Sequence, residues 1–316
     1  MRSGEFQLAL RDGRPLCGWR WSPDGETRAG LLIVHGMAEH GARYRRFAEA
    51  CTTQGIEVFA PDLPGHGRSA RRDGDLGHFA DRDGWDYALH AVHLARGAAA
   101  ESLRLKPLFV LGHSMGSFLM QHYLVRHGQH LAGAILSGTN GDLGPLRRVG
   151  LALISAEALL AGRRAPSKVG DQIGFKAYAR EFKPRRTDFD WLSRDEAEVD
   201  AYVADPLCGF PCTTALWTDL LEACGGLADP ARLKRLPRTL PVLLVAGSRD
   251  PVSRGRIGPG ILAEAYKRAG LGQVSVRIWP EARHELLNET CRDEVTSELL
   301  AWMSAAVQKR GLNAGA

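Results

Sequence analysis

The stretch LFVLGHSMGSFLM, residues Leu108–Met120, restricts the fold more than any other part of the sequence. Its first four residues are continuously apolar, as in a strand buried on both faces, and the residues after Ser114 read as a helix. A strand that passes into a helix within GHSMG must turn so sharply that side chains at the first and last positions would clash. Gly112 and Gly116 avoid that clash. The stretch therefore predicts a strand, a tight turn and a helix, with the hydroxyl of Ser114 exposed at the bend.

Apolar strands and helices alternate on both sides of this unit, after an N-terminal hairpin expected over Glu5–Leu10 and Leu16–Trp21. Such alternation, with strands that are apolar throughout, predicts an α/β fold with a mostly parallel central sheet covered by helices on both faces. Strands are expected over Gly30–Val34, Ile56–Ala60, Leu108–Leu111, Ala132–Leu136, Pro241–Val245 and Val274–Ile278, and helices over Tyr44–Gln54, Trp85–Glu101, Met115–Arg126, Ile261–Arg268 and Arg292–Lys309.

The alternation is interrupted between about Gly141 and Pro237, where helical segments, arginine pairs and prolines occur without a clear buried strand. At 316 residues and 44% hydrophobic content, the chain is long enough for one large α/β domain with an insertion. We therefore expect one core in two parts, residues 1–140 and 238–316, with a helical insertion over residues 141–237.

Charge and composition argue against nucleic-acid binding and against secretion. The net charge is +5, but basic and acidic residues are interspersed and only 7% of residues are aromatic, which is typical of a solvated mixed surface. The N-terminal residues lack the apolar run of a signal peptide or a membrane span. We expect a cytoplasmic protein.

The cysteines are scattered along the chain, without the dense framework of a small secreted protein, and are expected to be reduced. Cys208 and Cys212 resemble half of a metal site, but no histidine or second cysteine pair follows at ligand spacing. The sequence therefore predicts neither a metal nor an organic cofactor.

Function in an open parallel sheet collects where loops leave the carboxyl ends of the strands. A serine needs a base to become nucleophilic, and the base needs a carboxylate to orient it. His284, in the loop after the last strand, is the candidate base. Asp250, directly beyond the strand Pro241–Val245, is the candidate acid, and it is favoured over Asp142, which stands where the insertion begins and is better explained as a cap or turn residue.

An oxyanion that forms on the substrate needs backbone donors. The tripeptide His35-Gly36-Met37 follows the strand Gly30–Val34, and its glycine lets the backbone turn its N–H groups toward the serine. Met115, the residue after the candidate nucleophile, stands at a helix N-terminus. The backbone N–H groups of Met37 and Met115 are the expected oxyanion donors.

Together these motifs resemble the α/β-hydrolase superfamily and, within it, the monoacylglycerol lipase and lysophospholipase branch, also grouped with serine aminopeptidase-like hydrolases. The resemblance rests on IVHGMAEH with the following Arg43-Tyr44, on DLPGHGRS, and on GHSMG. It implies the α/β-hydrolase fold with the insertion as its cap. The order Ser114, Asp250, His284 is that of the superfamily's catalytic triad.

The resemblance also implies a serine hydrolase that cleaves carboxylic esters through an acyl-enzyme intermediate, without cofactor or metal. The expected partner is a small, lipid-like ester, either a monoacylglycerol or a lysophospholipid. A peptidase, thioesterase or acyltransferase on the same residues is the alternative among enzymes. A receptor-like protein that binds a ligand with little turnover is the alternative of another class. The sequence leaves the oligomeric state open.

The run VGLALISAEALLA, residues Val149–Ala161, is almost entirely apolar or small and lies between two arginine pairs. It is shorter than the ~20 residues that cross a bilayer, so an interfacial helix or a buried helix remains. We expect a cap helix over the mouth of the site that can also contact a membrane surface transiently. Replacing Leu153 and Ile154 with serine is expected to weaken vesicle binding.

Overall fold

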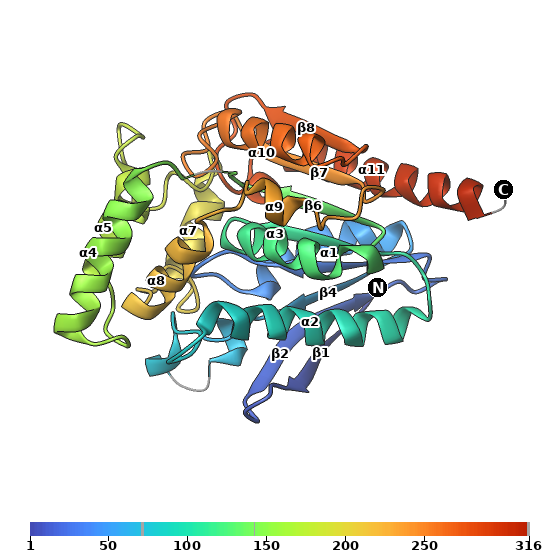
Figure 1. Cartoon of the computed structure of the whole chain (residues 1–316). Helices are drawn as coiled ribbons and strands as arrows, with labels where there is room; N and C mark the ends of the chain where they lie inside the picture. The colour runs from blue at the N-terminus through green and yellow to red at the C-terminus, as the bar shows by residue number, and fades with distance from the viewer. Residues whose placement is uncertain (71–72, 142, 315–316) are drawn as a thin grey trace.

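In the computed structural model, which describes residues 1–70, 73–141 and 143–314, eight strands of the described chain form one sheet in the order β1-β2-β4-β3-β5-β6-β7-β8 (Figure 1). The first two strands pair antiparallel as the expected hairpin, and β3 to β8 are parallel to one another. The sheet therefore confirms the mostly parallel α/β architecture. The strands are β1 (Arg2–Ala9), β2 (Pro15–Ser22), β3 (Ala29–Val34), β4 (Ile56–Pro61), β5 (Leu108–His113), β6 (Gly133–Ser137), β7 (Val242–Gly247) and β8 (Val274–Trp279).

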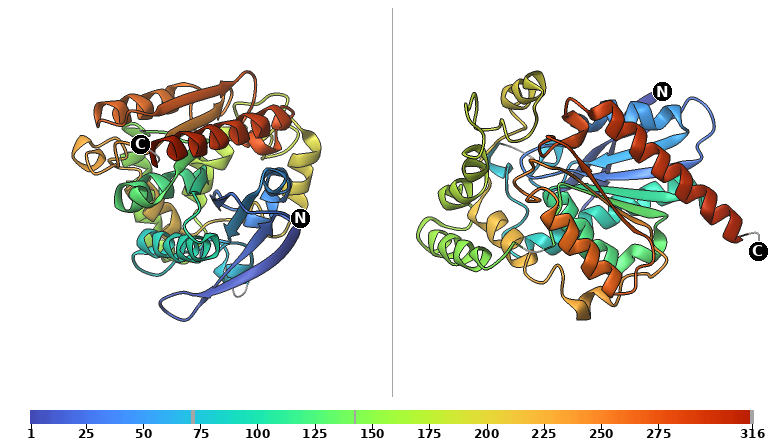
Figure 2. Two further views of the ribbon diagram at one scale, coloured as in Figure 1. Left: turned by 90° about the vertical axis from the view of Figure 1, so that its right-hand side faces the viewer. Right: turned by 90° about the horizontal axis from the view of Figure 1, so that it is seen from above.

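Helices pack on both faces of the sheet, which explains why the inner strands are apolar throughout. In β3, Leu31 and Ile33 are buried in the layer beneath α1 and α11. Leu32 and Val34 are buried in the opposite layer, beneath α2, α3 and α10 (Figure 2). The helices are α1 (Arg45–Thr53), α2 (Gly84–Leu103), α3 (Met115–His127), α10 (Ile257–Arg268) and α11 (Arg292–Ala314).

Helix α10 begins four residues before the predicted start, at Ile257 rather than Ile261. The prediction was wrong because Gly258, Pro259 and Gly260 read as helix breakers. Pro259 lies in the first turn, where its missing N–H would have no partner within the helix, so it is tolerated there.

Helices also make up the segment between β6 and β7, and α4, α5, α7 and α8 gather at the side of the sheet opposite the C-terminal end of α11 (Figure 1). Helix α4 packs on α8 and α5, and the missing side chain of Gly150 makes room for Leu221 of α8 and Ile173 of α5. Among the described residues, no helix combines the length and the hydropathy needed to span a bilayer. The helices are α4 (Leu146–Ala161), α5 (Lys168–Ile173), α6 (Phe175–Ala179), α7 (Glu196–Ala204), α8 (Thr214–Ala223) and α9 (Pro230–Leu233).

Candidate active site

Ser114 stands at the bend between β5 and α3 with φ +50° and ψ −121°, a backbone conformation that costs energy for a residue other than glycine. The glycines on both sides make the bend possible. A Cβ atom on Gly116 would lie 2.1 Å from the carbonyl oxygen of Val34, and one on Gly112 would lie 2.6 Å from the carbonyl oxygen of Gly116. The clash predicted from the sequence is therefore confirmed, and this strained turn fixes the position of the serine.

The structure brings His284 and Asp250 into direct contact. Nδ1 of His284 lies 2.8 Å from Oδ1 of Asp250, and both residues are buried. The same Oδ1 also accepts a hydrogen bond from the backbone N–H of Val252, at 2.9 Å. Because a carboxylate can only accept, Nδ1 carries the proton and neutral His284 has its lone pair on Nε2. Nε2 is buried and has no hydrogen-bond partner within the described part of the chain, so it can accept a proton.

The pKa values of the two residues shift in opposite directions, so that Asp250 stays ionised and the protonated form of His284 is stabilised. Burial lowers the pKa of His284, but the charge and hydrogen bond of Asp250 outweigh burial and bring it above the usual 6.5. Burial raises the pKa of Asp250, and the opposing effects of His284 and the nearby hydrogen bonds bring it below the usual 3.8. Asp250 therefore stays ionised beside a histidine whose protonated form it stabilises.

Two aromatic rings enclose His284. The ring of His113, next to Ser114 in the chain, lies 4.6 Å from it between centroids, and the ring of Trp191 lies 5.1 Å away. The backbone N–H of His284 donates to the carbonyl of Trp191, at 3.3 Å. The bend at Ser114 and the loop after β8 therefore meet, and a residue from the segment between β6 and β7 covers the histidine.

The loop after β3 also reaches this bend, since a Cβ atom on Gly36 would lie 3.2 Å from Cβ of Ser114. His35 holds the loop: its Nδ1–H donates to the Gly36 carbonyl at 2.8 Å, and its Nε2 accepts from the N–H of Leu63 at 2.9 Å. Burial lowers the pKa of His35 to about 3, so the ring stays neutral. The N–H of Gly36 is used by Glu39, at 2.6 Å, which leaves Met37 as the next amide of the loop.

Sequence reasoning missed a buried ionic network that joins this loop to the loop after β8. Arg43 donates to both carboxylate oxygens of Glu285, at 2.6 and 2.7 Å, and to Glu39, at 2.8 Å. Tyr44 donates to the other oxygen of Glu39, at 3.0 Å. Glu285 adjoins His284, so the network fixes the candidate oxyanion loop relative to the candidate base. The charged residues of the motif AEHGARY were visible in the sequence, but the motif does not show that Arg43 pairs with Glu285.

This network predicts a pH-dependent contribution to stability. Burial raises the pKa of Glu285, but Arg43 opposes it more strongly and brings the value to about 2. Its carboxylate therefore stabilises the fold above the unfolded pKa of 4.5, and that contribution is lost as the pH falls from 4.5 toward 2. Glu285→Gln is expected to lower the free energy of unfolding at pH 7 by about 3 kcal/mol and to flatten its dependence over that window. Urea unfolding at pH 7 and pH 3.5 measures both effects.

The matched control is Glu49→Gln, which removes a carboxylate from the exposed pair of Arg45 and Glu49. Exposed pairs contribute about 0–1 kcal/mol, so this variant should unfold almost like the wild type. Equal losses in the two variants would show that the buried network adds no stability of its own.

Asp142, the alternative acid, lies outside the described residues. Of the other predicted site residues, Asp250 and His284 are in contact, and Ser114 and Met37 lie on the bend and the loop that meet beside them. Met115 is the first residue of α3. The assignment of catalytic roles to these five residues stays a prediction.

A mostly parallel sheet of this order, with a serine at a glycine-flanked bend after β5, has the architecture of an α/β-hydrolase. Residues 25–291 match the family described as serine aminopeptidase, S33, and the chain belongs to this family. It falls in the monoacylglycerol lipase-like branch of the α/β-hydrolases, as the sequence motifs predicted.

Three known proteins illustrate the similarity. Monoacylglycerol lipase of Mycolicibacterium smegmatis is 28% identical over 290 residues, which cover 90% of this chain and 90% of that protein. Human monoglyceride lipase is 28% identical over 313 residues, which cover 98% of this chain and 91% of that protein. The crystal structure of a highly thermostable carboxyl esterase from Bacillus coagulans, in complex with glycerol, matches with a TM-score of 0.87 and 25% identity, covering 97% of this chain and 99% of the esterase.

Proposed function

We propose that this chain is a serine hydrolase that cleaves lipid-like carboxylic esters, monoacylglycerols or lysophospholipids, through an acyl-enzyme intermediate. At the coarser level, the chain is a carboxylic ester hydrolase of the α/β-hydrolase fold. The observation that carries the finer proposal is the buried hydrogen bond between Asp250 and His284, which leaves Nε2 of the histidine able to accept a proton beside the bend that holds Ser114.

In the proposed mechanism, His284 takes the hydroxyl proton of Ser114 through Nε2 as the oxygen attacks the ester carbonyl. The backbone N–H groups of Met37 and Met115 donate to the oxyanion that forms. His284 then returns the proton to the departing alcohol. In the second half, His284 activates a water molecule that releases the carboxylic acid from Ser114. Asp250 keeps the imidazole in the required tautomer and stabilises its charged form throughout.

The substrate class is tested with a panel of esters that varies acyl chain length and head group. Monoacylglycerols and lysophosphatidylcholines are compared with short p-nitrophenyl esters, aminoacyl anilides and acyl-CoA. The proposal expects multiple turnovers, with the highest kcat/KM on a lipid ester. Preference for the anilides would support the peptidase alternative, the activity that the description of the family names. Tight binding with less than one turnover would indicate a receptor-like protein.

We further propose that the segment over residues 141–237 acts as a cap and that α4 contacts lipid surfaces. The exposed apolar side chains of α4 are large, and one arginine pair lies in its first turn while another follows its C-terminal end. Ile154 is not among them: it is fully buried, so it cannot contact a lipid surface unless the packing of α4 changes. Almost every residue of the run is apolar or small, so its sequence alone does not show which side faces inward. The exposed residues are Leu146, Val149, Leu153, Leu159 and Leu160, with exposed fractions from 51% to 91%.

The double variant Leu153→Ser and Leu160→Ser therefore tests the exposed side of α4. Both side chains are exposed, so the fold should tolerate the change. Vesicle binding is expected to weaken at least tenfold, roughly the effect of losing about 1.5 kcal/mol of apolar burial. Hydrolysis of long-chain esters should fall in parallel, while short soluble esters are cleaved as before. Co-sedimentation with vesicles and parallel rate measurements check both statements.

Leu105→Ser is the matched control, because Leu105 is a fully exposed leucine just after α2 and outside the proposed cap. It should change neither vesicle binding nor hydrolysis. Equal losses on short and long esters in the double variant would mean that α4 only supports the fold. Unchanged vesicle binding would remove the membrane role.

A further inference from the structure

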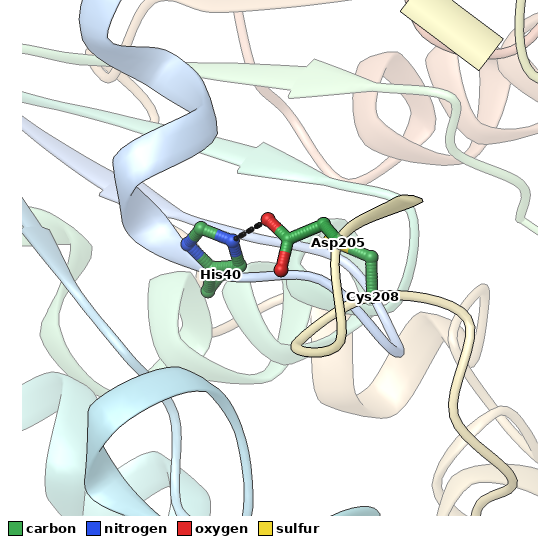
Figure 3. A group of neighbouring side chains, drawn as sticks. All are labelled: His40, Asp205 and Cys208. Carbon is green, nitrogen blue, oxygen red and sulfur yellow. Dashed lines mark hydrogen bonds and ion pairs between the residues drawn. The ribbon is translucent and has the colours of Figure 1, made fainter. Parts of the chain in front are cut away.

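Three side chains with metal-binding atoms meet beside the loop that follows β3 (Figure 3). Nε2 of His40 lies 2.8 Å from Oδ2 of Asp205, and one ligand atom from each of His40, Asp205 and Cys208 lies within 4.8 Å of the other two. His40 and Cys208 are buried, and Asp205 is half-buried. His40 and Asp205 stand 165 positions apart in the chain, so the cysteine spacing in the sequence could not reveal the group.

We propose that His40, Asp205 and Cys208 bind a divalent cation of borderline softness, with Zn²⁺ as the best match. Imidazole nitrogen, carboxylate oxygen and thiolate sulfur are the three donor types that Zn²⁺ takes in proteins. Zn²⁺ bond lengths of about 2.0–2.3 Å place tetrahedral ligands roughly 3.5 Å apart, so small rotations of these side chains would suffice. The hydrogen bond between His40 and Asp205 opens, and the proton of His40 Nε2 passes through solvent to Nδ1, which frees the Nε2 lone pair for the ion. The thiol releases its proton to solvent as the Zn–S bond forms, and water completes the fourth position.

The backbone around the group is arranged before any ion arrives. Oδ1 of Asp205 accepts the N–H of Leu207 at 2.8 Å, and the N–H of Cys208 donates to the carbonyl of Asp205 at 3.0 Å. This turn fixes the carboxylate and the thiol on one short loop after α7. The N–H of Gly209 then donates to the carbonyl of Ala38, at 2.9 Å, which attaches the turn to the loop that carries His40. Ligands held on a rigid frame lose little conformational freedom on binding.

The charges around the group are balanced. The positive charge of Arg43 favours the thiolate form of Cys208. Glu39 and Glu285, which pair with Arg43, disfavour it. The positive charge of Arg43 is therefore offset by two carboxylates. Asp205 and the thiolate would supply the negative charge that a divalent cation requires. A bound ion would cross-link the loop after α7 to the loop that follows β3.

Titration of the purified full-length chain with Co²⁺ tests the site without reference to esterase activity. Co²⁺ bound by a thiolate gives a sulfur-to-metal charge-transfer band in the near ultraviolet, and Zn²⁺ should displace it. Wild type and the control Cys212→Ser, which removes a neighbouring buried thiol outside the group, should both show the band. Cys208→Ser should lack the band and bind the metal more than about 100-fold more weakly. A band that persists in Cys208→Ser, or that is absent from wild type, would overturn the proposal.

Thermal unfolding with and without Zn²⁺ gives an independent measurement. Zn²⁺ at about a hundredfold excess over its Kd should raise Tm by roughly 3–8 °C in wild type and in Cys212→Ser, but not in Cys208→Ser. Circular dichroism shows whether Cys208→Ser is folded. Should it misfold, Asp205→Asn serves instead, because it keeps the thiol and is expected to lower metal affinity at least tenfold. An equal Tm increase in wild type and in either site variant would contradict a site made of these three residues.

Discussion

Ser114→Ala is expected to lose nearly all esterase activity, with kcat falling roughly 10⁵–10⁶-fold, which is the scale seen when a serine nucleophile is removed. The substitution deletes one oxygen atom and keeps the Cβ atom, so the turn between Gly112 and Gly116 is unchanged. The free energy of unfolding should stay within about 0.5 kcal/mol of the wild type. Steady-state turnover of a p-nitrophenyl ester and of a monoacylglycerol, together with urea unfolding, measures both quantities.

Ser297→Ala is the control for this experiment, since Ser297 is exposed on α11 and its hydroxyl donates to the carbonyl of Asp293 in the same helix. It should hydrolyse both esters at the wild-type rate. Substantial activity in Ser114→Ala would require another nucleophile and would remove the proposed mechanism.

Asp250→Asn is expected to lower kcat about 10⁴-fold, because an amide can donate to Nδ1 of His284 and so favour the wrong tautomer. The proton would then reside on Nε2, and the imidazole could not accept another from the serine. The pKa of His284 lies above 6.5 in the wild type, partly through the charge of Asp250. The acid limb of kcat/KM should therefore lie above pH 6.5 in the wild type and move to lower pH in the residual activity of the variant.

Asp142→Asn is the comparison variant and should change activity little. Should it prove the more damaging of the two, the acid would have to be reassigned to Asp142. Measuring kcat/KM for both variants from pH 5 to 9 separates an effect on His284 from a general loss of folding. An effect on His284 shifts the acid limb of the pH profile, whereas a loss of folding does not.

Local sterics explain why the bend and the strands could be predicted from sequence. The inner strands begin and end within one or two residues of their predicted bounds, because continuous apolar runs bounded by turn residues leave few alternatives. The bend at Ser114 follows from two glycines that cannot carry a Cβ atom there. Asp250 and His284 could be predicted to lie at one site because the carboxyl ends of the strands share one edge of the sheet, and the structure places them in contact.

The ionic network and the group around His40 could not be predicted, because each depends on partners that are distant in the chain. Arg43 and Glu285 are 242 positions apart, and no local pattern pairs them. The same holds for His40 and Asp205. In α4 the obstacle is different: almost every residue of the run is apolar or small, so periodicity cannot show that Ile154 faces inward while Leu153 is half exposed.

The contacts of Trp191 and Leu192 attach one stretch of the segment between β6 and β7 to the loop after β8. Their carbonyls accept the backbone N–H groups of His284 and Glu285, at 3.3 and 2.8 Å. Further along, Arg194 pairs with the fully buried Glu289 at 2.8 Å. Displacing this stretch would pull the histidine loop with it and expose a buried carboxylate. If the segment is the proposed cap, its opening would therefore have to leave Trp191, Leu192 and Arg194 in place.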